Sequence, residues 1–283
     1  MIAAITATFD ASLKLALLFL AARHEELAAS SPHRCHPLVN APEIAIIADV
    51  HGNARALEAV LADIARLGSK TIVNLGDNAN GPLEPARCVQ LLRASGAVHV
   101  RGNGDRMTGE GGPHVRGSAA FGRERLNPDA LRWLHELPPL VERDDWVAFH
   151  ATPHSDEDYF LETIAGRATT LASPADISAK LGPLNASLVL CGHTHLQRLV
   201  RLPDGRTIVN PGSVGLPAYE DETPTPHVIE AGSPHARYAT AHREAGEWHI
   251  VFHAVAYDWN AAAATARAAG WPGWAAQLET GRC

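Results

Sequence analysis

Asp49 and His51 are the first side chains in this chain whose types and spacing suit chemistry. They stand two residues apart, directly after the apolar run Ile44–Ala48. A carboxylate and an imidazole on one loop are a hard and a borderline metal ligand, which is a common way to begin a metal site. Because Asp-x-His also occurs by chance in ordinary turns, the pair becomes informative only together with further ligands.

Such ligands recur along the chain, each shortly after a run of β-forming residues. In chain order the candidate metal ligands are Asp49, His51, Asp77, Asn103, His150, His193 and His195. Taken singly, each has an ordinary explanation as a turn residue, a hydrogen-bonded core histidine or part of a solvated loop. Seven nitrogen and oxygen ligands in equivalent places are hard to obtain by chance, so the pattern predicts a metal site.

The elements that must position these residues alternate between strand and helix. Ile44–Ala48 is short, β-branched and unalternated, which is typical of a strand covered on both faces. Asn53 is a plausible N-cap, apolar residues recur at helical spacing from Leu57 to Leu67, and Gly68 is a stop signal. The first third of the chain is therefore predicted as β-α-β-α-β, a parallel sheet whose carboxyl edge is where ligands bind.

The remainder of the chain supplies further strands and helices. The predicted elements are strands at 70–75, 97–100, 146–149 and 187–190, helices near 84–94 and 128–137, hairpins pairing 198–202 with 207–209 and 236–242 with 248–255, and two short Ala-rich helices at the end. We find no internal repeat in the sequence.

Composition limits the partners of the protein. The 283 residues are 46% hydrophobic, which suffices for one large or two modest domains with a real core. Lys and Arg number 24 against 31 Asp and Glu, a formal net charge of -7, so stable binding to nucleic acid is not expected. The four cysteines lie far apart without C-x-x-C spacing, which favours a reduced, cytoplasmic protein.

The segment 1–42 is predicted to be an N-terminal helical extension or linker, ahead of a single domain at 43–283. Its apolar run Leu13–Ala22 is too short to span a bilayer. Asp10 before the run and Lys14 inside it argue against a secretion signal. We therefore expect no contact with a membrane.

Taken together, the motifs Asp-x-His, Gly-Asp, Gly-Asn, His and Gly-His-x-His resemble those of the calcineurin-like metallophosphoesterase superfamily. The loop 210–215, Asn-Pro-Gly-Ser-Val-Gly, is similar to one common in its small bacterial and archaeal phosphodiesterase branch. The resemblance runs from Glu43 to the C-terminus and implies an α/β fold, a four-layer α/β/β/α sandwich of the metallophosphoesterase type. By motif match, Asp49, His51 and His195 would hold one metal ion, Asn103, His150 and His193 the other, and Asp77 would bridge the two.

Such a dinuclear centre would act on phosphate esters. Two divalent ions carry four positive charges against two carboxylates, so the site attracts a phosphate oxyanion, and the expected nucleophile is a metal-bridging hydroxide. Histidine-rich ligation favours manganese, the leading candidate, or iron, zinc, nickel or cobalt over magnesium. The expected substrates are small phosphodiesters or nucleotides, such as cyclic nucleotides, aryl diesters and phosphoanhydrides. The sequence does not decide whether the protein forms a homo-oligomer.

Other residues around these motifs are weaker candidates. Asn53, Arg101 and Arg106 are candidate substrate contacts, although Asn53 is equally well explained as a helix cap and loop arginines are often only solvated. Asp105 could orient a ligand or a water from behind the site. His154, four residues after His150, is a candidate general acid.

The sequence departs from the superfamily at Gly104. Much of the superfamily has Gly-Asn-His-Asp where this chain has Gly-Asn-Gly-Asp at 102–105, and that histidine is thought to protonate the leaving oxygen. Without it, substrates with poor leaving groups should suffer most. We expect phosphodiesters to be preferred over alkyl monoesters, with Gly104 leaving room for the second substituent, unless His154 or His114 supplies the proton.

Other functions remain in competition with this interpretation. One alternative is a phosphomonoesterase, including a protein Ser/Thr phosphatase. Another is a non-catalytic scaffold, because a retromer subunit uses this fold for protein contacts; an intact set of ligands argues against it. A DNA exonuclease is disfavoured by the acidic balance of the chain and the lack of a DNA-binding extension.

Overall fold

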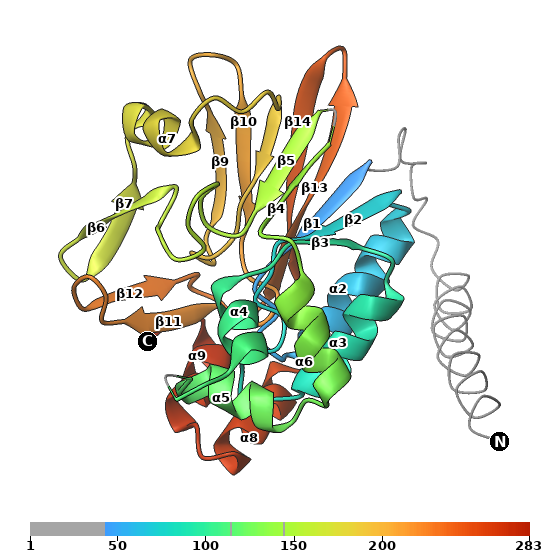
Figure 1. Ribbon diagram of the computed structural model, residues 1–283, viewed down its shortest axis with the longest axis vertical. Helices are drawn as coiled ribbons and strands as arrows, with labels where there is room; N and C mark the ends of the chain where they lie inside the picture. Colours follow the sequence, from blue (N-terminus) through green and yellow to red (C-terminus); the bar gives the residue numbers. More distant parts are fainter. Residues whose placement is uncertain (1–42, 114, 144) are drawn as a thin grey trace, which may run out of the picture. The chain divides into compact units, whose positions relative to one another are not determined.

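Two five-stranded sheets form the centre of the computed structural model, which describes residues 43–113, 115–143 and 145–283 (Figure 1). The first sheet has the order β14 (Glu247–Val255), β13 (Ala236–Glu244), β1 (Ile44–Ile47), β2 (Thr71–Asn74), β3 (Val98–His99). The second has the order β4 (Leu140–Glu142), β5 (Trp146–Phe149), β8 (Leu188–Leu190), β10 (Thr207–Pro211), β9 (Gln197–Arg201). Because β1, β2 and β3 run parallel, as do β5, β8 and β10, each sheet collects several carboxyl ends at one edge.

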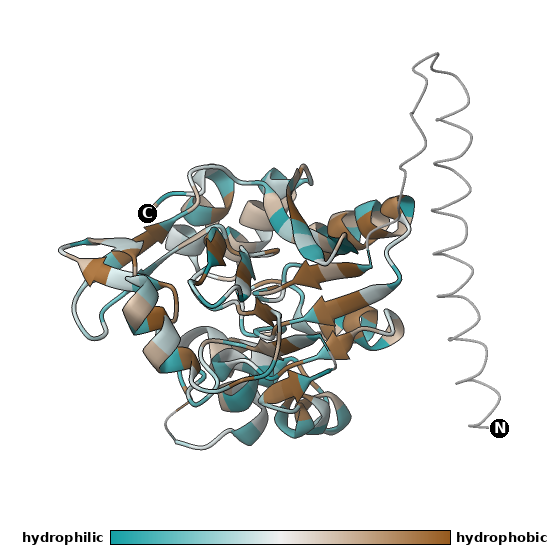
Figure 2. Cartoon of the chain, turned by 90° about the horizontal axis from the view of Figure 1, so that it is seen from above, coloured by the Kyte–Doolittle hydropathy of each residue, from teal (hydrophilic) through white to brown (hydrophobic). Residues whose placement is uncertain are grey.

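Three hydrophobic layers hold four layers of structure together. One core lies between the two sheets and includes Ile46, Val73 and Leu190. A second joins the first sheet to α2 (Ala54–Leu67) and α3 (Pro85–Ala94), and a third packs α7 (Pro174–Leu181) on the second sheet. In Figure 2 the strands are mostly coloured as hydrophobic and the outer helices carry both colours. The predicted α/β fold, a four-layer sandwich, is confirmed.

The first β-α unit forms for the reasons that the sequence predicts. All four residues of β1 are buried, as a strand covered on both faces requires. The side chain of Asn53 caps α2 by accepting a hydrogen bond from the N–H of Ala56 at 3.2 Å. The helix ends at Gly68, whose φ of 73° lies in the left-handed region that glycine adopts without strain.

Several elements were not predicted. They are α4 (Asn103–Glu110), α5 (Gly117–Glu124), α7, the hairpin of β6 (Glu162–Ala165) with β7 (Ala168–Leu171), and the hairpin of β11 (Ala218–Asp221) with β12 (His227–Glu230). They are short, and most of the β6–β7 residues are at least partly exposed, so no apolar period marks them. The predicted helices α6 (Pro128–Glu136), α8 (Trp259–Ala268) and α9 (Pro272–Thr280) are all present.

The predicted N-terminal extension, residues 1–42, lies outside the described residues and stays a prediction. Of the helices that the structure describes, none combines the length and the apolarity that a bilayer crossing needs.

Candidate metal centre

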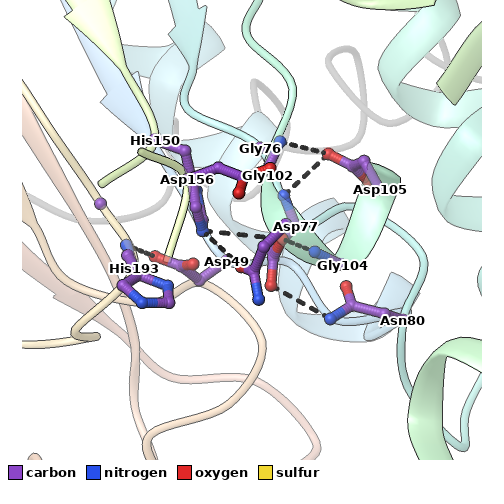
Figure 3. Close-up of polar contacts among 12 residues, drawn as sticks. Asp49, Gly76, Asp77, Asn80, Gly102, Gly104, Asp105, His150, Asp156 and His193 are labelled. Carbon is purple, nitrogen blue, oxygen red and sulfur yellow. Dashed lines mark hydrogen bonds and ion pairs between the residues drawn. The ribbon is translucent and has the colours of Figure 1, made fainter. Parts of the chain in front are cut away.

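Five of the predicted ligands converge where the strands of the two sheets end. Figure 3 shows three of them, Asp49, Asp77 and His150, close together. Ligand atoms of Asp49, His51 and His195 all lie within 4.8 Å of one another, and so do those of Asp49, Asp77 and His150. All five residues are buried. These carboxylates and imidazoles come from loops spread over nearly 150 residues of sequence, and the donor set is one that divalent metal ions use.

In the first group, the Nε2 atoms of two imidazole rings point toward each other. Nδ1–H of His51 donates to the carbonyl of Asn80 at 3.2 Å, and Nδ1–H of His195 donates to the carbonyl of Leu216 at 2.7 Å. Each neutral ring therefore has its lone pair on Nε2, and the two Nε2 atoms are 3.0 Å apart. Oδ1 of Asp49, a buried oxygen without a hydrogen-bond partner among the described residues, lies 3.5 Å from Nε2 of His195. A cation held by all three atoms would satisfy each of them.

Asp77 belongs to the second group and also faces His51 of the first. Its Oδ2 is 3.8 Å from Nε2 of His51, and its Oδ1 is 3.6 Å from Nε2 of His150. His150 is anchored like the others, because its Nδ1–H donates to the carbonyl of Leu75 at 2.8 Å. Its Nε2 is also 3.1 Å from Oδ1 of Asn103. The two oxygens of Asp77 thus face one imidazole from each group, which is the placement expected of a bridging ligand.

His193 is turned the other way round. Its ring stands 5.0 Å from that of His150, and its Nε2–H donates to the carbonyl of Glu157 at 2.8 Å. Nδ1 is therefore the atom left for an ion. Asn103 and His193 are half-buried and flank the two groups, so the structure brings all seven predicted ligands into one region.

The backbone at this site is strained. Among the described residues, six other than glycine have a positive φ, and five of them are candidate ligands: Asp49, His51, Asp77, His193 and His195. Side chains with a Cβ rarely adopt this region, and it costs of order 1–3 kcal/mol each. Strain of this kind persists where the surrounding structure holds it in place, and it clusters at functional sites.

The loop Asn210–Gly215 supplies part of that support. Ser213 Oγ and the N–H of Gly215 both donate to the carbonyl of Asp49, at 2.8 and 2.9 Å. Nδ2 of Asn210 donates to the carbonyl of Gly192, beside His193, at 2.7 Å. One loop therefore fixes the Asp-x-His turn of the first sheet and the His-x-His turn of the second.

Comparison with known proteins agrees with this geometry. Residues 43–232 match the model of the calcineurin-like phosphoesterase superfamily domain. The chain belongs to the calcineurin-like phosphoesterase superfamily. A metallophosphoesterase structure from Sphaerobacter thermophilus is similar with a TM-score of 0.66 and 27% identity, covering 86% of this chain and all of that one. A hypothetical protein from Pyrococcus horikoshii has the same fold, with a TM-score of 0.64 and 19% identity over 84% of this chain and 98% of that one.

The chain also has a relative of similar sequence. An uncharacterised protein of Methanocaldococcus jannaschii is 26% identical over 200 residues, which are 62% of this chain and 76% of that protein. Membership of the superfamily makes this chain a metal-dependent phosphoester hydrolase, and the cluster of Asp49, His51, Asp77, His150 and His195 fits a divalent metal site.

Asp105 supports the centre from behind, as a positioning residue. Its carboxylate accepts hydrogen bonds from the backbone N–H groups of Asp77, Asn78 and Gly102, at 2.9, 2.9 and 3.1 Å. In the ion-free protein, burial and the charge of Asp77 raise the pKa of Asp105 to about 7. Burial lowers the pKa of His51 to about 4, so its imidazole is uncharged at neutral pH and keeps a lone pair for a metal ion.

The predicted substrate contacts have partners within the protein. Asn53 caps α2 and donates to the carbonyl of Gly215 at 3.0 Å, so it is used as a tether. Arg106 forms a two-bond ion pair with Asp156, at 2.7 and 3.0 Å. Arg101 donates to the carbonyl of His135, while its buried Nε has no hydrogen-bond partner in the described part of the chain. Contact of these residues with a substrate stays a prediction.

Of the two candidate general acids, one lies among the described residues. His154 is exposed, and its Nε2 lies 3.9 Å from where a Cβ on Gly182 would be, just beyond α7. His114 lies outside the described residues.

The sequence did not single out the residues that line the centre from the sides. The ring of Tyr219, in β11, packs 4.7 Å from that of His195, and Tyr159 packs 5.4 Å from His193. Trp274, in α9, stands 6.0 Å edge-on from His51. Asn80 reaches Asp77 directly, with Nδ2 donating to Oδ2 at 3.0 Å. A turn sequence and scattered aromatics carry no signal for such contacts.

One expectation is wrong. Gly104 does not leave free volume beside the carboxylate of Asp77, because a Cβ there would lie 2.0 Å from Nδ2 of Asn80. The space is filled by an amide from another loop.

Proposed function

We propose that this chain is a phosphodiesterase that uses two divalent ions, with manganese the leading candidate, to hydrolyse small phosphodiesters or nucleotides. The observation that carries the proposal is the convergence of anchored imidazole lone pairs and carboxylates on left-handed backbone. In water-excluded surroundings, lone pairs 3.0 Å apart repel unless a cation lies among them. A scaffold protein has no need of such an arrangement.

In this proposal Asp49, His51 and His195 hold one ion, and Asn103, His150 and His193 hold the other. Asp77 contacts both, which its two oxygens, each facing an imidazole of a different group, support. When bound, the ions would act as Lewis acids on the phosphoryl group and lower the pKa of water. The protein fixes the rings through Nδ1–H or Nε2–H bonds to backbone carbonyls, so that few ligand atoms must move on binding.

The preference for diesters rests on proton supply. Neither Gly104 nor Asn80, which fills the space beside it, can donate a proton to a leaving oxygen. General acid catalysis is typically worth about 10²–10⁴-fold, and its absence matters most for basic alkoxide leaving groups. Aryl diesters, 2′,3′-cyclic phosphates and phosphoanhydrides depend on it least. The wide spacing of the cysteines supports a cytoplasmic site of action, and the net charge of -7 supports action on small molecules rather than nucleic acid.

A substrate and metal screen tests the proposal. The purified chain is stripped with a chelator, reloaded with Mn²⁺, Co²⁺, Ni²⁺, Zn²⁺ or Mg²⁺, and assayed with a bis-aryl phosphate, an aryl phosphate, an alkyl phosphate, cyclic nucleotides and a dinucleoside polyphosphate. We expect metal-dependent turnover that is fastest for diesters or anhydrides. The Asp77→Ala variant, purified in parallel, controls for contaminating phosphatases.

Two results would contradict the proposal and favour another function. Faster hydrolysis of alkyl monoesters than of diesters would make the chain a phosphomonoesterase. Binding of much less than one equivalent of transition metal, with no turnover after addition of Mn²⁺, would favour the scaffold.

A further inference from the structure

The surroundings of Gly104 leave no place for a side chain. An ideal Cβ on this residue would lie 2.0 Å from Nδ2 and 2.2 Å from Cγ of Asn80. The backbone cannot easily move away, because the N–H of Gly104 donates to Oδ1 of Asp77 at 2.7 Å. Glycine at 104 and asparagine at 80 are therefore mutually dependent: one is small because the other is present.

Asn80 is held from both ends. Its Nδ2 donates to Oδ2 of Asp77 at 3.0 Å, and its backbone carbonyl accepts from Nδ1–H of His51 at 3.2 Å. The loop that carries it is packed closely from α5, since a Cβ on Gly122 would lie 2.4 Å from the carbonyl oxygen of Ala79. Asn80 is 6% exposed, so its carboxamide has little freedom to leave this position.

The orientation of the amide follows from its partner. Ionised Asp77 can only accept hydrogen bonds, so the NH₂ group of Asn80 must face it. Oδ1 of Asn80 is then turned away from Asp77, and it is a buried acceptor without a partner among the described residues. Figure 3 shows Asn80 and Gly104 on the same side of Asp77, away from His150 and His193.

We propose that Asn80 is a positioning and specificity-determining residue of this centre. It holds the second oxygen of Asp77, occupies the space that a side chain at 104 would need, and places a neutral amide where a proton donor would otherwise fit. An amide cannot supply a proton to a departing alkoxide. The specificity part of this inference rests on the proposed phosphodiesterase function, whereas the positioning part does not.

Thermal stability of the metal-free chain tests the mutual dependence. Gly104→Ala alone should lower Tm by about 2–8 °C, because Cβ overlaps the Asn80 carboxamide. In the Asn80→Ala background the same substitution should raise Tm by about 1–4 °C, because alanine is favoured over glycine in a helix and the obstacle is gone. The predicted signature is a reversal of sign, which a merely destabilising site would not give.

Gly273→Ala is the matched control. Gly273 is the second residue of α9 as Gly104 is the second residue of α4, and a Cβ on Gly273 would meet no atom within 4 Å. Its replacement should raise Tm equally in both backgrounds. If Gly104→Ala behaves as Gly273→Ala does, Asn80 moves aside freely and the inference is overturned.

Metal affinity tests the positioning of Asp77. Loss of a hydrogen bond that orients a ligand typically costs about 10–100-fold in metal affinity. Asn80→Ala should therefore weaken Mn²⁺ binding by that factor, whereas Gly273→Ala should bind Mn²⁺ as the wild type does. The affinity is measured by titration, with free Mn²⁺ followed by its electron paramagnetic resonance spectrum. Wild-type Mn²⁺ affinity in Asn80→Ala would remove the positioning role.

A series of aryl and alkyl methyl phosphodiesters tests the specificity. The wild type should lose kcat/KM steeply as the leaving alcohol becomes more basic. The double variant Asn80→Ala/Gly104→His, which has room for an imidazole, should show a shallower dependence, and Gly104→His alone should not. Equal slopes in wild type and double variant would overturn the specificity role. A wild type that hydrolyses nothing would overturn it together with the proposed function, while the stability and Mn²⁺ results would still decide the positioning role.

Discussion

Two clusters of histidine and carboxylate in this chain offer the same donor atoms in very different settings. In the metal centre, and again at His242, Glu244 and His249 on the β13–β14 hairpin, three ligand atoms lie within 4.8 Å of one another. The hairpin imidazoles stack at 5.1 Å and 18°, and Nε2 of His242 is 3.9 Å from Glu244. By residue type and distance alone, the two clusters are hard to tell apart.

They differ in how the donors are held. Each histidine of the centre donates from one ring nitrogen to a backbone carbonyl, which fixes its tautomer and aims the other nitrogen. Within the described part of the chain, neither His242 nor His249 has such a bond, and the Glu244 side chain is 63% exposed. The hairpin cluster also lies at the other edge of the sheet, because Ala241 pairs with Ile44 at the start of β1. Anchoring, burial and backbone strain distinguish a built site from a chance grouping.

Removing the carboxylate of Asp77, the proposed bridging ligand, should have the largest effect. Asp77→Ala deletes a carboxylate whose two oxygens face His51 and His150, one imidazole from each group. We expect loss of at least one equivalent of metal and a fall of at least about 10³-fold in kcat/KM, because a metal ion contributes several kcal/mol to charge stabilisation. Elemental analysis, steady-state kinetics and circular dichroism check metal, turnover and fold. Near-normal metal content and activity would contradict the dinuclear assignment.

Removing the support behind the ligands should have the next largest effect. Asp105→Ala leaves the buried N–H groups of Asp77, Asn78 and Gly102 without their acceptor. Each unsatisfied group costs about 1–3 kcal/mol, so the free energy of unfolding should fall by several kcal/mol, and metal affinity by about 10–100-fold. Urea unfolding of the metal-free protein measures the first quantity and Mn²⁺ titration the second. If stability falls but affinity does not, Asp105 supports the fold only.

The sequence predicted those features of the fold and the site that depend on residues close together in the chain. A buried run that ends in Asp49-x-His51, with Asn53 and Gly68 delimiting a helix, is readable because strand, ligand and cap are neighbours in sequence. The contact of Asn80 with Gly104 is not readable in this way, because Gly-Asp-Asn-Ala-Asn is an ordinary turn until α4 and α5 pack against it. The pairing of Arg106, in α4, with Asp156 likewise joins residues 50 positions apart in the sequence.

The hairpin cluster should show a small effect or none. His242→Ala and His249→Ala should leave metal content unchanged and hydrolysis within about twofold of wild type, because rings without an anchoring hydrogen bond gain little from organising an ion. His51→Ala, a substitution of the same type inside the centre, provides the contrast and should lose metal. A full equivalent of metal lost from either hairpin variant would show that anchoring is not needed, and the comparison would fail.

Substitution of His154 should have the smallest effect on turnover. Like the metal-ligand candidates it lies close to a ligand in sequence, but like the hairpin histidines its ring is not anchored. It follows the ligand candidate His150 by four residues, yet it is exposed and its ring lies near Gly182. Its ring has no anchoring bond to a carbonyl among the described residues, so nothing aims it at a leaving group. We expect His154→Ala to keep the turnover of aryl diesters within about twofold of wild type. If His154 is not the general acid, the turnover of alkyl diesters should change equally little. A selective loss of about 10²-fold on alkyl diesters, the lower range for general acid catalysis, would instead make His154 the proton donor. Parallel assays of both substrate classes separate these outcomes, since a general loss of metal or stability would reduce both.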